Sequence, residues 1–425
     1  MHKKAGLLFR CLLAISLLAE TSCGDNNTAP KTAVQNKTEI ILPEGFSSSI
    51  VADTVGPLRH IAVNRQGDIY VKLSGLKNGK GIYCLSDTDH DGKADKRTGF
   101  GNYPGTGILI KNDVLYASSN TSVFKYALDE KGQVKDTANP QVIVKGLIDK
   151  NRDNSKSIAV DDKGNLYVTI GSYDETCTLP NSSMGMQGCP LLDSVGGVWQ
   201  FKTDLADQSY NNSVQYGRGL KNVVGINWNS NTHSLFVVMH GRGSFSEKFP
   251  QYYSSQQDAE LPAEAMYELQ QGADAGWPFI YYDQNRKKKM LSPEYGGDGK
   301  KTVDNKYIDP VIAFPAHLGP NDLLFYTGNM FPEKYHNGAF IAFHSKSSVL
   351  KKGYFVAFVP FINGKPSGQW EIFADNFAGI DLTQNNNGAI QHRPMGLAQG
   401  PDGALYVADD IKGTIYKIIY TGNNK

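Results

Sequence analysis

The chain carries almost no net charge. Its 43 basic and 42 acidic residues leave a formal charge of +1 at pH 7. A protein that binds nucleic acid or an anionic membrane through a broad surface needs a clear excess of positive charge. The composition therefore argues against such partners and favours a partner that is small or neutral.

Several short catalytic motifs are also absent. The sequence has no GxSxG elbow, HExxH helix, Walker loop or strand-linked GxGxxG, which argues against a serine hydrolase, a zinc protease and a nucleotide-binding enzyme. Cysteine is scarce, with 5 residues and no CxxC pair of metal-binding spacing. In an oxidising compartment Cys177 and Cys189 are expected to form a disulfide, whereas Cys84, in the apolar run GIYCL, is expected to be a buried thiol.

The apolar run near the N-terminus, Leu12–Ala19, is too short to span a bilayer and follows three basic residues, as in an export signal. The sequence Thr-Ser-Cys-Gly then ends the segment as in bacterial lipoproteins. We predict that residues 1–23 are a lipoprotein-type signal peptide ending at the lipidation site Cys23, and that residues 24–40 form a flexible tether. The alternative is a plain, unstructured mature N-terminus.

This reading predicts an exported protein, in the periplasm or on the outer membrane or cell surface of a bacterium. Contact with the membrane would be through the lipid anchor only.

Residues typical of short strands and tight turns are abundant, with 44 glycines, 22 tyrosines and 19 phenylalanines. A turn followed by aliphatic and aromatic residues recurs as GDIYV at Gly67, NDVLYA at Asn112, GNLYV at Gly164, HSLFVV at His233, NDLLFYTG at Asn321 and GALYV at Gly403. A strand-sized unit repeated in this way indicates blades or coils stacked around one axis. We predict an all-β fold, a six-bladed β-propeller over residues 41–421 with long inter-strand loop insertions. An open β-solenoid fits repeats this long and unequal less well.

The expected insertions are residues 171–196, 241–263 and 281–309, and such loops are where function concentrates. The last contains Arg286-Lys287-Lys288-Lys289, which is expected to be a solvated surface. The ring is expected to close by pairing of Ser48–Ala52 with the strand near Thr414–Tyr420, which removes exposed edges.

Four carboxylates, Asp87, Asp89, Asp91 and Asp95, alternate around a glycine in DTDHDGKAD. This spacing converges oxygen ligands on a hard cation and resembles calcium loops of the EF-hand type, although Thr98 stands where the full loop has a glutamate. The alternative is a polar turn without an ion. A bound ion here is expected to stiffen the loop rather than to take part in chemistry.

Histidine and basic residues beside predicted strands are the other candidates for a site. The histidines are His240, His317, His344 and His392, and the basic residues include Lys221, Arg242 and Arg393. A single histidine in such a place is more often structural than catalytic. If the cations converge on the axis, they would suit a compact polyanion.

Longer segments carry a family resemblance. They are LPEGF at Leu42, KSIAVDDKGNLYV at Lys156, GCPLLDSVGGVWQF at Gly188, ELPAEAMYEL at Glu260, GWPFIYYD at Gly276, PEYGGDGKK at Pro293, LLFYTGNMFPEKYHNGAFIAFH at Leu323 and HRPMGLAQGPDGALYVADDIKGTIYKIIY at His392. Together they resemble the glucose/sorbosone dehydrogenase family, nearest to its sorbosone and pyranose dehydrogenase-like propellers that use pyrroloquinoline quinone (PQQ).

The resemblance implies that PQQ and calcium bind at the wide mouth of a propeller channel, where cations hold the three carboxylates of the quinone and a histidine acts as base. It implies cofactor-binding roles for Arg59, Lys221, Asn222, His344 and Arg393, and calcium-binding backbone carbonyls at Gly241 and Arg242.

The sequence departs from the family pattern in the same places. Asp153 stands where the family has its base histidine, and Lys221 replaces an arginine. Gly241-Arg242-Gly243 replaces GRD, and HSKSS at His344 replaces HGSWN. By position, Asp153 is therefore the candidate catalytic residue, since an aspartate can itself accept a proton.

The resulting expectation is PQQ-dependent oxidation of a sugar or related polyol or aldose, with electrons passed to an external acceptor. The alternative is a non-catalytic propeller that binds carbohydrate or quinone and has lost the base. A calcium-dependent lactonase on a similar fold is less consistent with the motifs.

Overall fold

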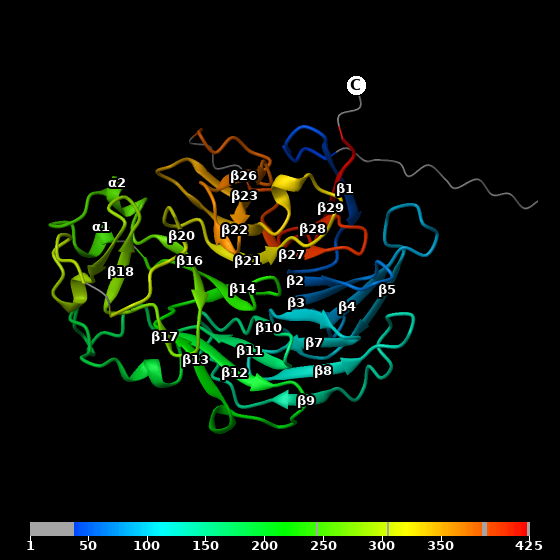
Figure 1. The fold of residues 1–425 in the computed structure, drawn as a ribbon, viewed down its shortest axis with the longest axis horizontal. Helices are drawn as coiled ribbons and strands as arrows, with labels where there is room; N and C mark the ends of the chain where they lie inside the picture. The colour runs from blue at the N-terminus through cyan, green and yellow to red at the C-terminus, as the bar shows by residue number, and fades with distance from the viewer. Residues whose placement is uncertain (1–37, 244, 304–305, 385–388, 423–425) are drawn as a thin grey trace, which may run out of the picture.

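The computed structural model describes residues 38–243, 245–303, 306–384 and 389–422, and its regular structure is almost entirely β-strand (Figure 1). Six antiparallel sheets follow one another along the chain, each with four strands in blade order and one extended by a fifth. The prediction of a six-bladed β-propeller is confirmed.

The first three blades are β2 (Leu58–Val63), β3 (Ile69–Lys77), β4 (Lys80–Ser86) and β5 (Lys96–Phe100); β6 (Ile108–Lys111), β7 (Val114–Ser118), β8 (Val123–Ala127) and β9 (Gln141–Val144); and β10 (Ile158–Val160), β11 (Asn165–Ile170), β12 (Gly197–Lys202) and β13 (Val214–Arg218), with β17 (Ala273–Asp274) at its edge.

Blades 4 to 6 are β14 (Val223–Asn229), β15 (Ser234–Met239), β16 (Glu264–Leu269) and β20 (Ile312–Phe314); β21 (Pro320–Phe325), β22 (Ala339–Ser347), β23 (Lys352–Val359) and β26 (Glu371–Ala374); and β27 (Pro394–Gln399), β28 (Leu405–Asp409), β29 (Ile415–Tyr420) and β1 (Phe46–Ala52). Outside the blades lie α1 (Phe245–Lys248), α2 (Ser255–Asp258), the hairpins β18 (Ile280–Asp283) with β19 (Lys288–Leu291) and β24 (Phe361–Ile362) with β25 (Lys365–Pro366), and four short 3-10 turns at Pro190–Asp193, Tyr210–Asn212, Pro293–Tyr295 and Glu333–Tyr335.

The first strand of every blade lines a central channel of about 280 Å³. Five of the six repeated phrases fall on second strands, as a regular blade repeat requires, but NDLLFYTG falls on β21, a first strand. The second strand of that blade is β22. Both strands are mostly buried and contain an apolar run, LLF in β21 and AFIAF in β22, so the apolar part of the phrase does not separate them.

The ring closes as predicted. Strand β1, from the start of the described chain, pairs antiparallel with β29, with Phe46 opposite Tyr420 and Ile50 opposite Tyr416. The last sheet is thus built from both ends of the chain, and its outer strand is supplied by the N-terminal segment. This pairing satisfies backbone groups that an unclosed blade would expose.

Strand direction divides the molecule into two faces. Because neighbouring strands within the blades are antiparallel, connections from a fourth strand to the next blade emerge at the same end as connections from second to third strands. We call this end the upper face. The first-to-second and third-to-fourth connections of a regular blade form the lower face.

The predicted insertions gather beside blades 3 and 4, where α1, α2 and β18 lie together at one side of the ring (Figure 1). The loops β11–β12 and β15–β16 emerge on the upper face. The chain after β16 reaches them because β17 runs parallel to β13 along the outer edge of blade 3. A small apolar core of Phe245, Tyr253, Leu261, Tyr281 and Met290 holds part of this inserted region.

The basic run in this region is not wholly solvated, contrary to expectation. Lys289 is 8% exposed, donates from Nζ to the Tyr307 carbonyl at 2.7 Å, and lies 3.0 Å from Asp309. Along β19, Lys288 is exposed, whereas Lys289 and Met290 are both buried.

None of the helices within the described residues is both long and apolar enough to cross a membrane. The predicted signal peptide, the lipidation site Cys23 and most of the tether lie outside the described residues.

Candidate functional site

The topology brings most of the predicted site residues to the upper face, around the propeller axis and beyond the residues that line the channel. We call this end of the axis the mouth. The residues gathered there are Arg59 at the start of β2, Asp153 between β9 and β10, Lys221 and Asn222 between β13 and β14, Gly241 and Arg242 after β15, His344 in β22 and Arg393 before β27. Residues far apart in the sequence thus meet because each follows or precedes a strand on the same side of the ring.

Lys221 lies in a cluster of hydrogen bonds with carboxylates. Its Nζ donates to Asp153 Oδ2 at 2.8 Å and lies 3.6 Å from Glu175 Oε2. Asn222 Nδ2 donates to Asp153 Oδ1 at 3.3 Å, and Arg152 pairs with Glu175. The Lys221 side chain is only 7% exposed, so its charge is balanced mainly by these carboxylates.

These contacts bear on the candidate base. Both carboxylate oxygens of Asp153 accept hydrogen bonds, one of them from the ammonium group of Lys221, so each oxygen already has a donor. The structure therefore gives Asp153 the surroundings of a counter-ion to Lys221. Beside it, the buried Asn222 Oδ1 has no hydrogen-bond partner among the described residues.

A second charged cluster lies across the mouth. Arg393 binds Asp410 with two donors, Nε at 2.7 Å and Nη2 at 2.8 Å. His344 Nε2 lies 2.9 Å from Asp410 Oδ2. Burial opposes ionisation of Asp410, but hydrogen bonds from His344 and Arg393 outweigh it and hold the pKa of this carboxyl below its usual value.

Arg59 connects the two clusters. Its Nε donates to Thr106 Oγ1 at 3.1 Å and its Nη2 to Ser155 Oγ at 2.9 Å, next to the loop that carries Asp153. Burial lowers the pKa of Arg59 to about 10, with Asp410 opposing and Arg393 adding to the shift. At neutral pH Arg59 is still charged, so three cations face this mouth.

His240 lies between the clusters and is neutral at neutral pH. Burial, together with the charge of Lys221, lowers the pKa of His240 to about 4. Its Nε2 lies 3.0 Å from the Pro320 carbonyl, an acceptor, so Nε2 carries the proton.

Gly241 and Arg242, which follow His240, help to hold the inserted region as well as forming part of the predicted site. Arg242 binds Glu294 through both terminal nitrogens at 2.6 and 2.5 Å and lies over the ring of Phe245. Its side chain is thereby committed to the inserted region. Only the backbone of Gly241 and Arg242 is left for the predicted role in calcium binding.

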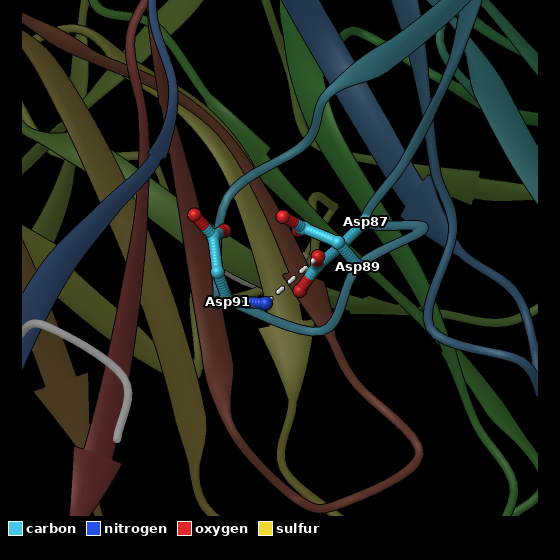
Figure 2. Close-up of side chains that lie close together, drawn as sticks. All are labelled: Asp87, Asp89 and Asp91. Carbon is cyan, nitrogen blue, oxygen red and sulfur yellow. Dashed lines mark hydrogen bonds between the residues drawn. The ribbon is translucent and has the colours of Figure 1, made fainter. Parts of the chain in front are cut away.

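The aspartate loop lies elsewhere. It joins β4 to β5, a third-to-fourth connection on the lower face, and is therefore separate from the mouth. Carboxylate oxygens of Asp87, Asp89 and Asp91 come within 4.8 Å of one another (Figure 2). Asp95 turns away to accept hydrogen bonds from the backbone and hydroxyl of Thr88. The predicted metal ligands thus divide between two places.

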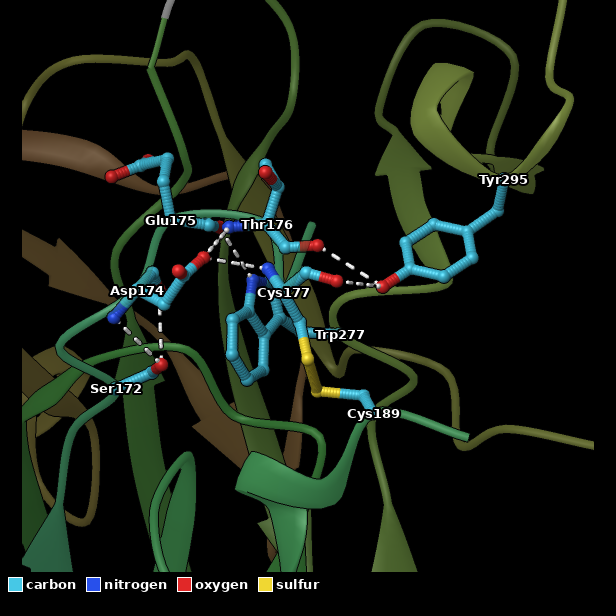
Figure 3. Close-up of a disulfide and its surroundings, with 8 residues drawn as sticks. All are labelled: Ser172, Asp174, Glu175, Thr176, Cys177, Cys189, Trp277 and Tyr295. Atoms are coloured by element: carbon cyan, nitrogen blue, oxygen red, sulfur yellow. Dashed lines mark hydrogen bonds between the residues drawn. A yellow bond between two sulfur atoms is a disulfide. The ribbon is translucent and has the colours of Figure 1, made fainter. Parts of the chain in front are cut away.

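Cys177 and Cys189 are joined by a disulfide on the upper face (Figure 3), and Cys84 is a buried thiol. Asp174 accepts hydrogen bonds from the backbone N–H of Cys177, and Trp277 Nε1 donates to the Glu175 carbonyl. The disulfide therefore stiffens the backbone that carries Glu175, a carboxylate beside Lys221.

The structure adds site residues that sequence reasoning missed: Asp410, Glu175, Ser155 and Thr106. Asp410 follows Asp409 at the end of β28 and has no motif of its own. Its partner His344 is 66 residues away, so only the blade arrangement reveals the pair.

Comparison with known proteins identifies a matching family and several relatives. A family model described as TrAA12-like matches residues 40–421. A pyrroloquinoline quinone-dependent sugar dehydrogenase of Hypocrea jecorina is 21% identical over 438 residues, covering 95% of each chain. An uncharacterized protein of Borreliella burgdorferi is 22% identical over 394 residues, covering 89% of this chain and 90% of that protein.

Solved structures share the fold. The calcium structure of the family AA12 enzyme of Trichoderma reesei has a TM-score of 0.71 at 18% identity and covers 92% of this chain and 99% of that one. The holo form of the pyranose dehydrogenase PQQ domain from Coprinopsis cinerea has a TM-score of 0.68 at 18% identity, covering 91% and 98%. The resemblance to PQQ sugar dehydrogenases is confirmed at the level of family, and the chain belongs to the TrAA12-like family.

Proposed function

We propose that this protein oxidises a hydroxyl group of a sugar or related polyol with bound PQQ and passes the electrons to an external acceptor. The observation that carries the proposal is the convergence of Arg59, Lys221 and Arg393 on one channel mouth, drawn from three different blades. Support also comes from relatives that are PQQ-dependent sugar dehydrogenases.

The charges of the mouth fit a tricarboxylate together with a divalent cation. Each of the three cations has a carboxylate nearby: Lys221 contacts Asp153 and Glu175, and Arg393 contacts Asp410, which also acts on Arg59. Arg152 also pairs with Glu175, so four positive and three negative groups leave the mouth with a net charge of about +1. A trianionic ligand alone would lack a full complement, so a calcium ion bound with it supplies the missing charge.

The side chains suit this ligand in kind as well. Arginine offers planar paired donors to carboxylates and lysine offers a point charge. The unpartnered, buried Asn222 Oδ1 is an acceptor suited to a donor group or a cation. Arg59, Lys221, Asn222 and Arg393 would hold the cofactor, and the carbonyls of Gly241 and Arg242 would bind the calcium.

When bound, PQQ supplies a carbonyl that accepts hydride, and calcium polarises it. The protein's part is to hold both groups, to orient the sugar above them and to take up the hydroxyl proton. One observation supports an alternative function. Asp153 is paired with Lys221, as expected if the propeller binds quinone or sugar without turnover.

One experiment separates the two functions. Purified protein is loaded with PQQ and calcium, cofactor binding is measured by fluorescence, and dye reduction is followed with a panel of sugars. Binding with dye reduction supports the enzyme, and binding without it supports the binding protein. Absence of PQQ binding would remove both.

We also propose export and lipidation at Cys23, since the N-terminal sequence has the form of a lipoprotein signal. In a bacterial host, replacing Cys23 by Ser is expected to move the protein from the membrane fraction to the soluble fraction. The same substitution should abolish incorporation of radiolabelled palmitate. Continued labelling of the Cys23→Ser variant would contradict the assignment.

A further inference from the structure

His344 and Asp410 form a hydrogen-bonded pair at the channel mouth. Because a carboxylate oxygen can only accept, the 2.9 Å contact places a proton on His344 Nε2. The neutral ring then has its lone pair on Nδ1, and no hydrogen bond to Nδ1 is found among the described residues. The pair is held on one side by Arg393, which binds Asp410, and on the other by the backbone N–H of His344, which donates to the Gly319 carbonyl at 2.8 Å.

The charges around His344 keep its ring ready to accept a proton. Asp410, Arg393, Arg59 and His240 are the titratable and charged groups that act on it. Burial lowers the pKa of His344 below its ordinary value, and the two arginines add to this effect while Asp410 opposes it. The imidazole is therefore neutral at neutral pH. Its side chain remains 20% exposed, so it is accessible from the mouth.

A second histidine–aspartate pair, in the last blade, has a different environment and holds the fold together. His392 Nδ1 lies 2.9 Å from Asp409 Oδ2. Asp409 is fully buried and also accepts hydrogen bonds from backbone N–H groups on both sides of the pair, and the His392 ring packs against Tyr416. His392 thus fastens two segments of the last blade together.

The geometry points to His344 Nδ1 as the acceptor of the sugar hydroxyl proton, with Asp410 as the residue that positions the ring. The inference rests on the proposed function and deepens it, because it assigns the proton that Asp153 is badly placed to take. In the step, the O–H bond breaks and its proton moves to Nδ1. The C–H bond of the same carbon breaks and its electron pair leaves as hydride to the quinone. A C=O bond forms, the sugar loses two electrons, the quinone gains two, and the imidazolium later releases its proton to solvent.

The first test needs no cofactor. Side-chain ¹⁵N spectra of the histidine-labelled apo-protein are recorded between pH 5 and 8, and His344→Gln identifies the signals. We expect the Nε2-protonated tautomer at neutral pH, and a change to the Nδ1-protonated tautomer in Asp410→Asn, whose amide can donate to Nε2. A His344 ring that is doubly protonated at pH 7, or protonated on Nδ1 in the unaltered protein, would overturn the inference.

The second test uses the PQQ-loaded protein. We expect His344→Ala to bind PQQ within about threefold of the unaltered protein while turnover falls about 10²- to 10⁴-fold, the range of general base catalysis. Added imidazole should restore part of the rate in proportion to its free-base form. The matched control His392→Ala should keep the rate per folded molecule and show no response to imidazole, with folding of each variant checked by thermal unfolding.

The outcomes separate this inference from the proposed function. If the unaltered protein does not bind PQQ, the proposed function fails, whereas the tautomer is still decided by the apo-protein spectra. If His344→Ala and His344→Gln both lose PQQ binding and imidazole has no effect, His344 is a cofactor ligand and the inference is wrong. If turnover is unchanged in folded His344→Ala, the proton is taken elsewhere.

Discussion

Replacing Asp153 by Asn is expected to weaken the fold and to tighten cofactor binding. The substitution removes the closest counter-ion of Lys221, whose side chain is 7% exposed, while Asp153 itself is 20% exposed. Exposed ion pairs contribute about 0–1 kcal/mol, and breaking a buried pair costs about 3–5 kcal/mol. Since Glu175 still lies 3.6 Å from Lys221, we expect a loss of about 1–3 kcal/mol in the free energy of unfolding.

The gain in binding has the same origin. Asp153 competes with the carboxylates of PQQ for Lys221 Nζ, so its removal frees the ammonium group. A gain of about 1–2 kcal/mol corresponds to about 5- to 30-fold tighter binding. Unfolding of the apo-protein in urea measures the first effect, and fluorescence titration with PQQ at fixed calcium measures the second.

Asp162→Asn is the matched control, because Asp162 pairs with Lys111 at 2.7 Å in the turn between β10 and β11 on the lower face. It should lower stability by about 1 kcal/mol or less and leave PQQ binding unchanged. The reasoning fails if folded Asp153→Asn binds PQQ no better than the unaltered protein, since Asp153 would then not compete for Lys221.

Three further outcomes are expected. Replacing Cys177 and Cys189 together by Ser should cost about 3 kcal/mol in urea unfolding, from a sequence separation of 12, whereas an unchanged midpoint would show that the bond adds no stability. Burial raises the pKa of Glu264 from 4.5 to about 8, so the stability it contributes is fully present below pH 4.5 and is lost as the pH rises through 8; Glu264→Gln should flatten this decline, and an unaltered slope would contradict it. Calcium should raise the melting temperature of the apo-protein less in the double variant Asp87→Asn, Asp91→Asn than in the unaltered protein, and an equal rise would assign the effect to another site.

The fold was predictable because its signal is local and repeated. Short apolar strands with a turn before them recur in every blade, and β1 has a partner only if the ring closes. The repeated phrase falls on a first strand only in blade 5, where β21 and β22 both contain a buried apolar run. The burial of Lys289 was not predictable from the sequence, because a run of basic residues gives no sign that one of them is buried.

The site was predictable in position but not in pairing. Strand ends show which residues reach the upper face, yet the ion pairs that define the site join distant positions: Lys221 lies 68 residues from Asp153 and His344 lies 66 residues from Asp410. No local period encodes such pairs. The resemblance leads us to expect a histidine at position 153, and the sequence alone shows neither the partner of Asp153 nor the contact between His344 and Asp410.

Two of the expected departures from the family pattern, at Asp153 and Lys221, lie in contact and act together on the charge of the mouth. Asp153 and Lys221 stand where the resemblance leads us to expect a histidine and an arginine, and they contact each other at 2.8 Å. The carboxylate of Asp153 lies next to the cation Lys221 and lowers the net positive charge of the mouth. Such a mouth attracts a trianion only weakly by itself, so binding of PQQ should depend more steeply on calcium in the unaltered protein than in the Asp153→His variant. Because Asp153 is paired with Lys221, it is badly placed to accept a proton on one side of the mouth, and the His344–Asp410 pair provides an acceptor on the other.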